Sequence, residues 1–277
     1  MNEPEITVSV FMVTYNHEKY IAQAIESVIN QKTNFQFELV IGEDCSTDNT
    51  RTIVESYKNK YPAIIKTVFQ KHNVGIKANV ESVFVNCKSK YVAILEGDDY
   101  WTDNNKLQKQ IDFLENNLDY SCCFHNVKTI VDDNKSRTWN FCKFKNDRSF
   151  TFDDIINDNF IPTCSVVFRN NITWDFLIKL RSIMAGDWFL HIYNSEKGKI
   201  YFMNEFMGVY RVHPNGQWAG LTQIEGIRFK INSLFDIDRA FDFRNTDKIR
   251  EIIFKMYLNK PVGYKDLIKH YKKRLKK

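Results

Sequence analysis

The sequence predicts an α/β protein with a mostly parallel sheet flanked by helices, followed by a helical C-terminal extension. Four strand-like segments alternate with four helix-like segments between residues 6 and 117. The first strand-like segment, residues 6–13, is apolar or small at nearly every position, which is typical of a strand covered on both faces of a parallel sheet. Such alternation favours a doubly wound sheet with right-handed crossovers.

The first half of the chain contains these four repeats. Strands are expected at residues 6–13, 37–43, 64–69 and 91–95. Helices are expected at residues 21–31, from Ser46 or Thr47 onwards, at 78–87 and at 105–117. Each helix carries apolar residues at helical spacing, and Ser and Thr are good N-caps for the second one.

The second half is less regular. Strands are expected at residues 120–131, 163–170 and 199–213, and two helical stretches between 173 and 198 break near Gly186. From Thr222 onwards the pattern is helical. We therefore expect one domain over residues 1–220, with halves 1–118 and 119–220, and a helical extension over 221–277.

Composition indicates a soluble protein that stays in the cytoplasm. Apolar residues make up 43% and charged residues 26%, and no apolar run approaches the roughly 18 residues that span a bilayer. The first residues, MNEPEITVSV, are acidic where a signal peptide is basic. The six cysteines show no CxxC spacing, so a zinc site or a disulfide framework is not expected.

The positive charge is concentrated at the C-terminus. Residues 265–277 hold seven Lys or Arg and one Asp, a net +6, which leaves the preceding residues at −1. A nucleic-acid-binding face is therefore not expected. For the amphipathic segment 264–277 two interpretations stay open: a solvated helix, or attachment to an anionic membrane surface, which would place the protein peripherally at the inner face of the membrane.

Polar residues follow the strands at the edge where a doubly wound sheet binds ligands. Asp98 and Asp99 come directly after the strand 91–95, Asp44 follows 37–43, and Thr14, Tyr15 and Asn16 end the first strand. Each is also an ordinary turn residue. Paired carboxylates at a strand end are nevertheless suited to Mg²⁺ or Mn²⁺ that arrives with a phosphate, because these cations prefer oxygen ligands.

Taken together, the segments VSVFMVTYN, YIAQAIESVINQ, FELVIGEDCSTDNT, NVG and YVAILEGDDYW resemble the family 2 glycosyltransferases. These are inverting enzymes with the GT-A fold that use nucleotide sugars. The resemblance is close over residues 6–115 and sparser over 185–213.

The resemblance assigns roles to individual residues. It implies that Thr14, Tyr15 and Asn16 contact the nucleobase of the nucleotide-sugar donor. It also implies that Asp44 binds the nucleoside and that Asp98 lies near the ribose. It implies a metal, Mn²⁺ or Mg²⁺, on Asp99.

In the sparser part, the resemblance makes Asp187 of GDW the catalytic base, although an aspartate at a helix N-terminus is also a common cap. Arg211 and His213 of YRVH would lie at the diphosphate, with His213 as a further metal ligand. Two stretches depart from the family pattern. GEDCS keeps Asp44 but has Glu43 and Cys45 where the family more often has aspartate and glycine, and Glu96 precedes the acidic pair where many relatives have aspartate.

The function implied is transfer of a hexose from a nucleotide sugar, most simply a UDP-sugar, to a glycan or lipid-linked acceptor in surface polysaccharide biosynthesis. The alternative is a non-catalytic protein of the same fold that binds sugar nucleotides or a membrane surface. A polymerase-type GDD hairpin does not fit, because the alternating β-α pattern and the body charge of −1 oppose a palm with a nucleic-acid channel.

Overall fold

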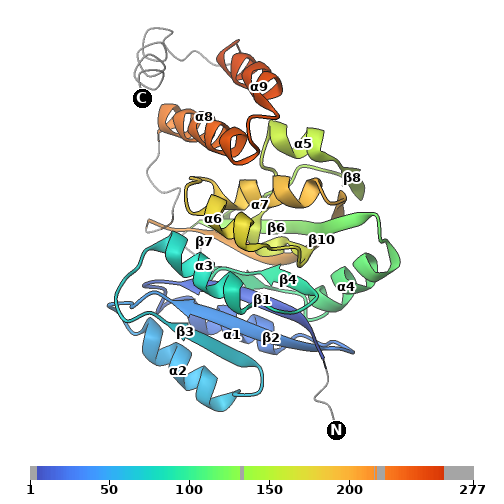
Figure 1. Cartoon of the computed structure of the whole chain (residues 1–277). Helices are drawn as coiled ribbons and strands as arrows, with labels where there is room; N and C mark the ends of the chain where they lie inside the picture. Colours follow the sequence, from blue (N-terminus) through green and yellow to red (C-terminus); the bar gives the residue numbers. More distant parts are fainter. Residues whose placement is uncertain (1–4, 132–133, 215, 217–221, 259–277) are drawn as a thin grey trace. The chain divides into compact units, whose positions relative to one another are not determined.

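The computed structural model describes residues 5–131, 134–214, 216 and 222–258. The chain forms two compact units, one of residues 1–181 and 187–219 and one of residues 182–186 and 220–277 (Figure 1). The first unit contains every described strand.

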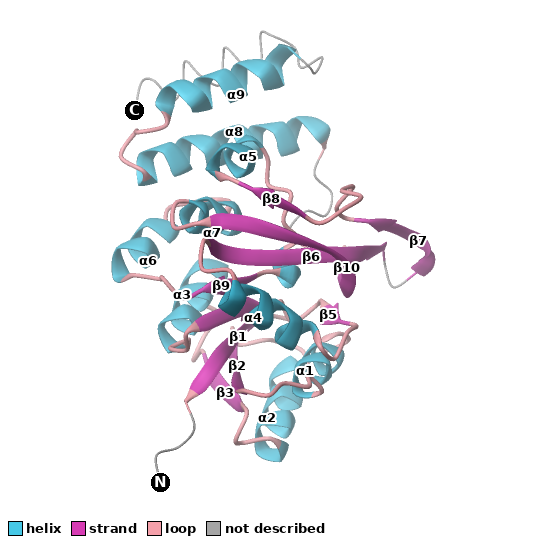
Figure 2. Cartoon of the chain, turned by 90° about the vertical axis from the view of Figure 1, so that its right-hand side faces the viewer, coloured by secondary structure: helices cyan, strands magenta, loops and turns pink. Residues whose placement is uncertain are grey.

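The first unit is built on a ten-stranded sheet (Figure 2). Its strands are β1 (Ile6–Thr14), β2 (Gln36–Glu43), β3 (Ile65–Phe69), β4 (Tyr91–Ile94), β5 (Tyr100–Trp101), β6 (Tyr120–Val131), β7 (Asn134–Asn140), β8 (Arg148–Phe150), β9 (Val167–Arg169) and β10 (Lys199–Val212). The order is β3-β2-β1-β4-β9-β6-β10-β5, with β7 on β6 and β8 on β10. Only β5, β7, β8 and β9 run against the common direction, which confirms the mostly parallel sheet.

Helices cover both faces of this sheet (Figure 2). They are α1 (Ile21–Ile29), α2 (Thr50–Lys60), α3 (Ile76–Asn86), α4 (Lys106–Asn116), α5 (Phe152–Asn157), α6 (Trp174–Leu180) and α7 (Gly186–Ser195). Val10 and Met12 of β1 belong to the core cluster that includes the apolar stripes of α1 and α4. Phe11 points to the opposite face, where its ring lies 4.4 Å from that of Phe84 in α3. The alternation of a strand therefore separates the two helical layers.

Helix α2 begins at Thr50, later than the expected Ser46 or Thr47. The backbone N–H and hydroxyl of Thr47 both donate to Asn16 Oδ1, and Ser46 Oγ accepts from Asn16 N. These two side chains bind the loop after β1 instead of capping the helix, so the first turn starts later in the sequence.

The polar stretch that follows residue 131 and runs to about Ser149 contains β7 and part of β8, neither of which the sequence predicted. Both are edge strands that take their register from β6 and β10 rather than from an apolar pattern of their own. Helix α5 was likewise not expected. It is initiated by a capping box in which Thr151 and Asp154 bond each other's backbone. The two helices expected between residues 173 and 198 are confirmed as α6 and α7.

The second unit holds α8 (Gln223–Ala240) and α9 (Thr246–Leu258). Thr222 and Glu225 form a capping box at the start of α8. Between the helices, Asp238 accepts hydrogen bonds from Asn245 N at 3.3 Å and from Thr246 Oγ1 at 2.7 Å, which fixes the turn. The helical character expected after Thr222 is confirmed as far as Leu258.

None of the helices in the described ranges is long and apolar enough to cross a membrane. The basic segment 264–277, for which two interpretations were open, lies outside the described residues.

The core of the first unit contains a buried lysine. The side chain of Lys106, at the start of α4, is 0% exposed, and its Nζ atom lies 3.9 Å from the ring centre of Trp101 in β5. Within the part of the chain that the structure describes, this Nζ atom has no hydrogen-bond partner. Burial lowers the pKa of Lys106 to about 7. An ammonium group without an acceptor is costly to bury, even against an aromatic face.

Candidate active site

The turn Glu96–Asp99 continues β4 along β1. Leu95 N and Gly97 N donate to the carbonyls of Phe11 and Val13, so the turn stays attached to the central strand. A Cβ atom at Gly97 would lie 2.7 Å from Thr14 Oγ1 and 3.1 Å from His17 Nδ1. Glycine at this position therefore allows the acidic turn to pack against the loop that follows β1.

The two neighbouring aspartates have different surroundings. The Asp99 side chain is 1% exposed, and its Oδ1 accepts from Arg211 N of β10 at 2.7 Å. Burial, together with the charges of Asp98 and Glu96, raises the pKa of Asp99 well above its usual range. Asp98 is partly exposed, and its Oδ2 lies 3.0 Å from His213 Nε2 and 3.8 Å from His17 Nε2. Burial acts to raise the pKa of Asp98, but the hydrogen bond from His213 and the charges of both histidines outweigh it and lower the pKa.

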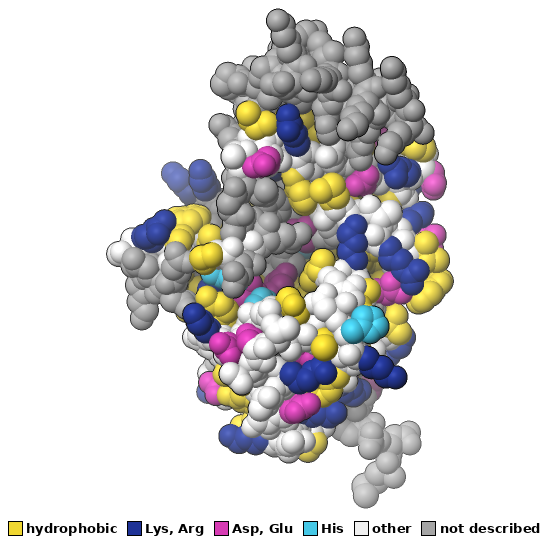
Figure 3. All heavy atoms as spheres, turned by 90° about the vertical axis from the view of Figure 1, so that its left-hand side faces the viewer, with side chains coloured by type: hydrophobic (Ala, Val, Ile, Leu, Met, Phe, Trp, Pro, Cys, Tyr) yellow, Lys and Arg dark blue, Asp and Glu magenta, His cyan; other side chains and the backbone are white. Residues whose placement is uncertain are grey.

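His17, Asp98 and His213 form a group that can hold a metal ion, because their ligand atoms all lie within 4.8 Å of one another. Acidic and histidine side chains also lie next to each other on the face drawn in Figure 3. Two imidazoles and one carboxylate are suitable ligands for a divalent cation. Asp99, which the resemblance made the metal ligand, is outside this group, and Asp98 is in it. That role for Asp99 stays a prediction, and the geometry favours Asp98.

Arg211 ties the turn to two other elements. Its Nη1 donates to the Asp98 carbonyl at 2.6 Å, and its Nη2 donates to Gln23 Oε1 of α1. The guanidinium lies over the rings of Tyr20 and Tyr100, 5.0 and 4.5 Å from their centres. These two donors already bind protein acceptors. Contact of Arg211 with a diphosphate, which the resemblance implies, remains a prediction.

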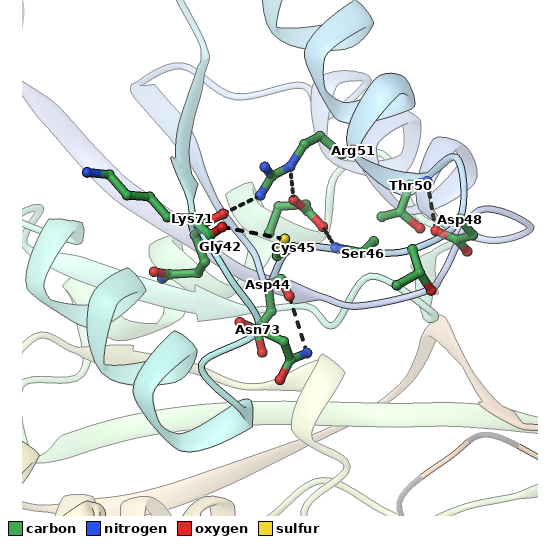
Figure 4. Close-up of polar contacts among 12 residues, drawn as sticks. Gly42, Asp44, Cys45, Ser46, Asp48, Thr50, Arg51, Lys71 and Asn73 are labelled. Carbon is green, nitrogen blue, oxygen red and sulfur yellow. Dashed lines mark hydrogen bonds and ion pairs between the residues drawn. The ribbon is translucent and has the colours of Figure 1, made fainter.

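Asp44 organises the loop after β3. Its Oδ1 accepts from Val74 N at 2.8 Å and its Oδ2 from Gly75 N at 3.0 Å, while Asn73 Nδ2 donates to the Asp44 carbonyl (Figure 4). The side chain is buried at the carboxyl end of β2. Asp44 thus joins two strand-end loops at the ligand edge, and its nucleoside-binding role stays a prediction.

The loop after β1 has one exposed ring and one structural amide. Asn16 adopts φ +55°, a left-handed conformation that asparagine tolerates, and its side chain holds the loop after β2. Tyr15 is 40% exposed. Three nearby buried atoms have no hydrogen-bond partner among the described residues: Thr14 Oγ1, His17 Nδ1 and Glu96 Oε2. These atoms leave hydrogen-bonding capacity for a polar ligand at this edge.

Asp187 lies in the first turn of α7 and is partly exposed. Its Oδ2 accepts from Asn159 Nδ2 at 2.8 Å. Burial raises the pKa of Asp187, against hydrogen bonds from the Trp188 backbone and Asn159 that lower it. The pKa of Glu96 rises to about 8, through burial first, then the charge of Asp98, and to a smaller extent that of Asp187. Asp187 is therefore within electrostatic range of the acidic turn.

Sequence reasoning did not single out His17, Gly97 or Asn159. His17 could have been identified from its position, because it lies three residues after Thr14, at a strand end that was already expected to bind ligand. Gly97 stands beside the acidic pair, where a close approach of backbone was a reasonable expectation. Asn159 lies in an irregular segment and gave no signal.

The amino-acid sequence matches a known protein family. The model of "Glycosyl transferase family 2" matches residues 9–173, which is more than half of the chain. The chain belongs to glycosyl transferase family 2. An uncharacterised protein of Mycobacterium tuberculosis is 35% identical over 210 residues, covering 76% of this chain and 60% of that protein. The chain thus spans about 60% of the length of this relative.

A second family relative has a more specific description. The putative teichuronic acid biosynthesis glycosyltransferase TuaG of Bacillus subtilis is 35% identical over 117 residues, or 42% of this chain and 44% of TuaG.

Two solved structures share the fold. S. aureus TarS in complex with UDP matches with a TM-score of 0.56 at 20% identity, over 87% of this chain and 73% of that one. A mannosyltransferase from Pyrobaculum calidifontis, in complex with GDP-Man and Mn²⁺, matches with a TM-score of 0.57 at 13% identity, over 97% and 81%. The expected family and GT-A fold are confirmed.

Cys45 is the departure from the family pattern whose structural effect is clearest. It adopts φ +57°, where a side chain costs about 1–2 kcal/mol. We expect Cys45→Gly to raise the free energy of unfolding by about 0.5–1 kcal/mol, since glycine removes the strain but loses more chain entropy. Urea unfolding measures this. Cys45→Ala is the matched control: it keeps Cβ and should give no gain, and equal gains for both variants would contradict the backbone explanation.

Proposed function

We propose that the protein transfers a hexose from a nucleotide sugar, specifically a UDP-sugar, to a hydroxyl of a glycan or lipid-linked acceptor with inversion. The observation that supports this proposal is the contact of His213 with Asp98 at the acidic turn of a family 2 chain, a turn on whose Glu96 the charge of Asp187 also acts. The complex of the similar TarS with UDP supports the choice of nucleotide. The similarity to TuaG supports a role in surface polysaccharide biosynthesis.

In the proposed reaction, the acceptor oxygen attacks the anomeric carbon of the donor sugar. The bond from that carbon to the diphosphate oxygen breaks, the nucleoside diphosphate leaves, and the acceptor proton passes to a carboxylate oxygen of Asp187. Asn159 orients that carboxylate through its hydrogen bond to Oδ2. The raised pKa of Asp187 makes it a stronger base than an ordinary aspartate, provided that it is ionised.

The donor would lie along the strand ends. The exposed ring of Tyr15 flanks the base, and Thr14 Oγ1 and Glu96 Oε2 offer the hydrogen-bonding capacity described above. A divalent cation held by Asp98 and His213 supplies, when bound, positive charge that stabilises the departing diphosphate. Arg211 holds the acidic turn in place through the Asp98 carbonyl.

A thermal-shift panel tests donor binding. We expect UDP and UDP-sugars with Mn²⁺ to raise the melting temperature, because a ligand at 100 times its Kd stabilises the native state by about 2.7 kcal/mol. GDP, dTDP and their sugar conjugates are measured in the same panel to test whether the protein prefers another nucleotide. No shift with any of them would refute the donor site, and a shift with GDP species alone would refute the choice of UDP.

Tyr15 provides the matched control for this panel. Loss of a stacked ring costs about 0.5–1.5 kcal/mol, so Tyr15→Ala should weaken UDP binding roughly threefold to tenfold, whereas Tyr15→Phe keeps the ring and the affinity. Because Tyr15 is 40% exposed, neither variant should disturb the fold.

A further inference from the structure

Residues on three distant segments converge at Asp98. His213 follows β10, Asp98 follows β4, and His17 lies in the loop between β1 and α1. The proposed function uses Asp98 and His213. His17 has no part in that proposal, although its ring is directed at the same carboxylate oxygen.

The distance between His17 and Asp98 does not correspond to a hydrogen bond. His17 Nε2 and Asp98 Oδ2 are 3.8 Å apart, beyond hydrogen-bonding range. Two atoms that each lie ~2.1 Å from a shared cation are roughly 3–4 Å apart. Both imidazole distances to Asp98 Oδ2, 3.8 Å for His17 and 3.0 Å for His213, fall in that range. The spacing is that of ligands around one ion.

The His17 ring is held in place by its surroundings. His17 N donates to Thr50 Oγ1 at 2.8 Å, and Glu18 N donates to Asp48 Oδ2 at 3.1 Å, so the loop is anchored to the start of α2. The absence of a side chain at Gly97 leaves room for the ring. The rings of His17 and His213 meet edge to face, 6.1 Å between centres and 89° between planes. The two imidazoles therefore approach the carboxylate from different directions.

The geometry points to His17 as a third protein ligand of the cation, which makes the site two imidazoles and one carboxylate. This inference rests on the proposed function for the role of the metal, but not for its binding. Imidazole nitrogen favours transition-metal dications, whereas Mg²⁺ prefers oxygen ligands and keeps its waters. The site takes Mn²⁺, Fe²⁺, Co²⁺ or Zn²⁺ in preference to Mg²⁺, and His17 contributes to that preference.

Pulsed electron paramagnetic resonance of Mn²⁺ bound to the full chain tests this, because it counts directly coordinated histidine nitrogens. Spectra are recorded with and without UDP, using protein with ¹⁵N-labelled histidine. The expected result is two coordinated nitrogens in the wild type and one in His17→Gln. The exposed His72 provides the matched control, and His72→Gln should keep two. One nitrogen in the wild type, or no Mn²⁺ binding under either condition, would overturn the inference.

Metal titrations give an independent measurement. Loss of a ligand should weaken Co²⁺ binding at least about tenfold in His17→Gln and change Mg²⁺ binding far less. If His17→Gln weakened Co²⁺ binding and Mg²⁺ binding equally, His17 would only position Asp98 and would not be a ligand. Two coordinated nitrogens without any nucleotide binding would leave the metal inference standing and refute the proposed function, so the two failures are distinguishable.

Discussion

Asp187→Asn is expected to lower kcat by about 10²–10⁴-fold, which is the usual contribution of a general base. The substitution preserves the shape of the side chain and still offers an oxygen to Asn159 Nδ2. Donor affinity, measured by titration with UDP, should change little. If Asp187 served only the N-terminus of α7, the variant would keep its rate and lose at most about 0.3–1 kcal/mol of stability, because asparagine caps a helix as well as aspartate and only the negative charge is lost. A rate near that of the wild type would therefore refute the assignment of the base.

The pH dependence of the wild type provides a second test of the same residue. A base must be ionised to accept a proton, and burial raises the pKa of Asp187. The value of kcat/KM should therefore fall as pH decreases through this raised pKa. Asp153, an exposed acid in the first turn of α5, supplies the matched control. Asp153→Asn should leave both the rate and its pH profile unchanged.

The second large effect is a gain of stability. Lys106→Met is expected to raise the free energy of unfolding at pH 7 by about 3 kcal/mol, because it removes a buried ammonium without an acceptor and keeps a side chain of similar length. This gain is net of the lost cation–π contact with Trp101, which is worth about 2 kcal/mol. Urea unfolding measures the difference.

The sign of the pH dependence follows from the two states of Lys106. Its pKa is 10.5 as an ordinary lysine and about 7 in the folded protein. Between these values the unfolded chain holds a proton that the folded chain lacks, so stability rises with pH by up to about 1.4 kcal/mol per unit. The gain from Lys106→Met should therefore shrink from pH 7 to pH 9. The exposed Lys77 is the control, and a gain for Lys77→Met of equal size would contradict burial as the cause.

Buried apolar strands and helical stripes were sufficient to predict the N-terminal half. The segments 6–13 and 91–95 are nearly continuous apolar runs, and β1 and β4 correspond to them closely. The short strand β5 was not predictable in this way, because its register is set by Gly208 and Val209 of β10. A strand whose pairing is determined by a distant partner need not show a periodic apolar pattern in its own sequence.

In the candidate site, too, some features follow from the local sequence and others depend on a distant strand. Asp98 and Asp99 could be placed at the ligand edge from the sequence, since they follow a strand of a parallel sheet. Which of them faces the histidines depends on β10, whose Arg211 N binds Asp99 and leaves Asp98 beside His213. The resemblance expected the metal on Asp99, and no local feature of the sequence distinguishes the two neighbours.

The reciprocal bonding between Arg211 and the aspartate pair also has a consequence for folding. Arg211 N donates to Asp99, 112 positions away, and its guanidinium returns to the Asp98 carbonyl. Closing so long a loop carries an entropic cost that has to be met before these bonds form. We therefore expect the N-terminal part of the sheet, β1 to β4, to gain structure earlier than the group of His17, Asp98 and His213. Substitutions that slow the docking of β10 would delay the appearance of a competent site without altering any residue in it.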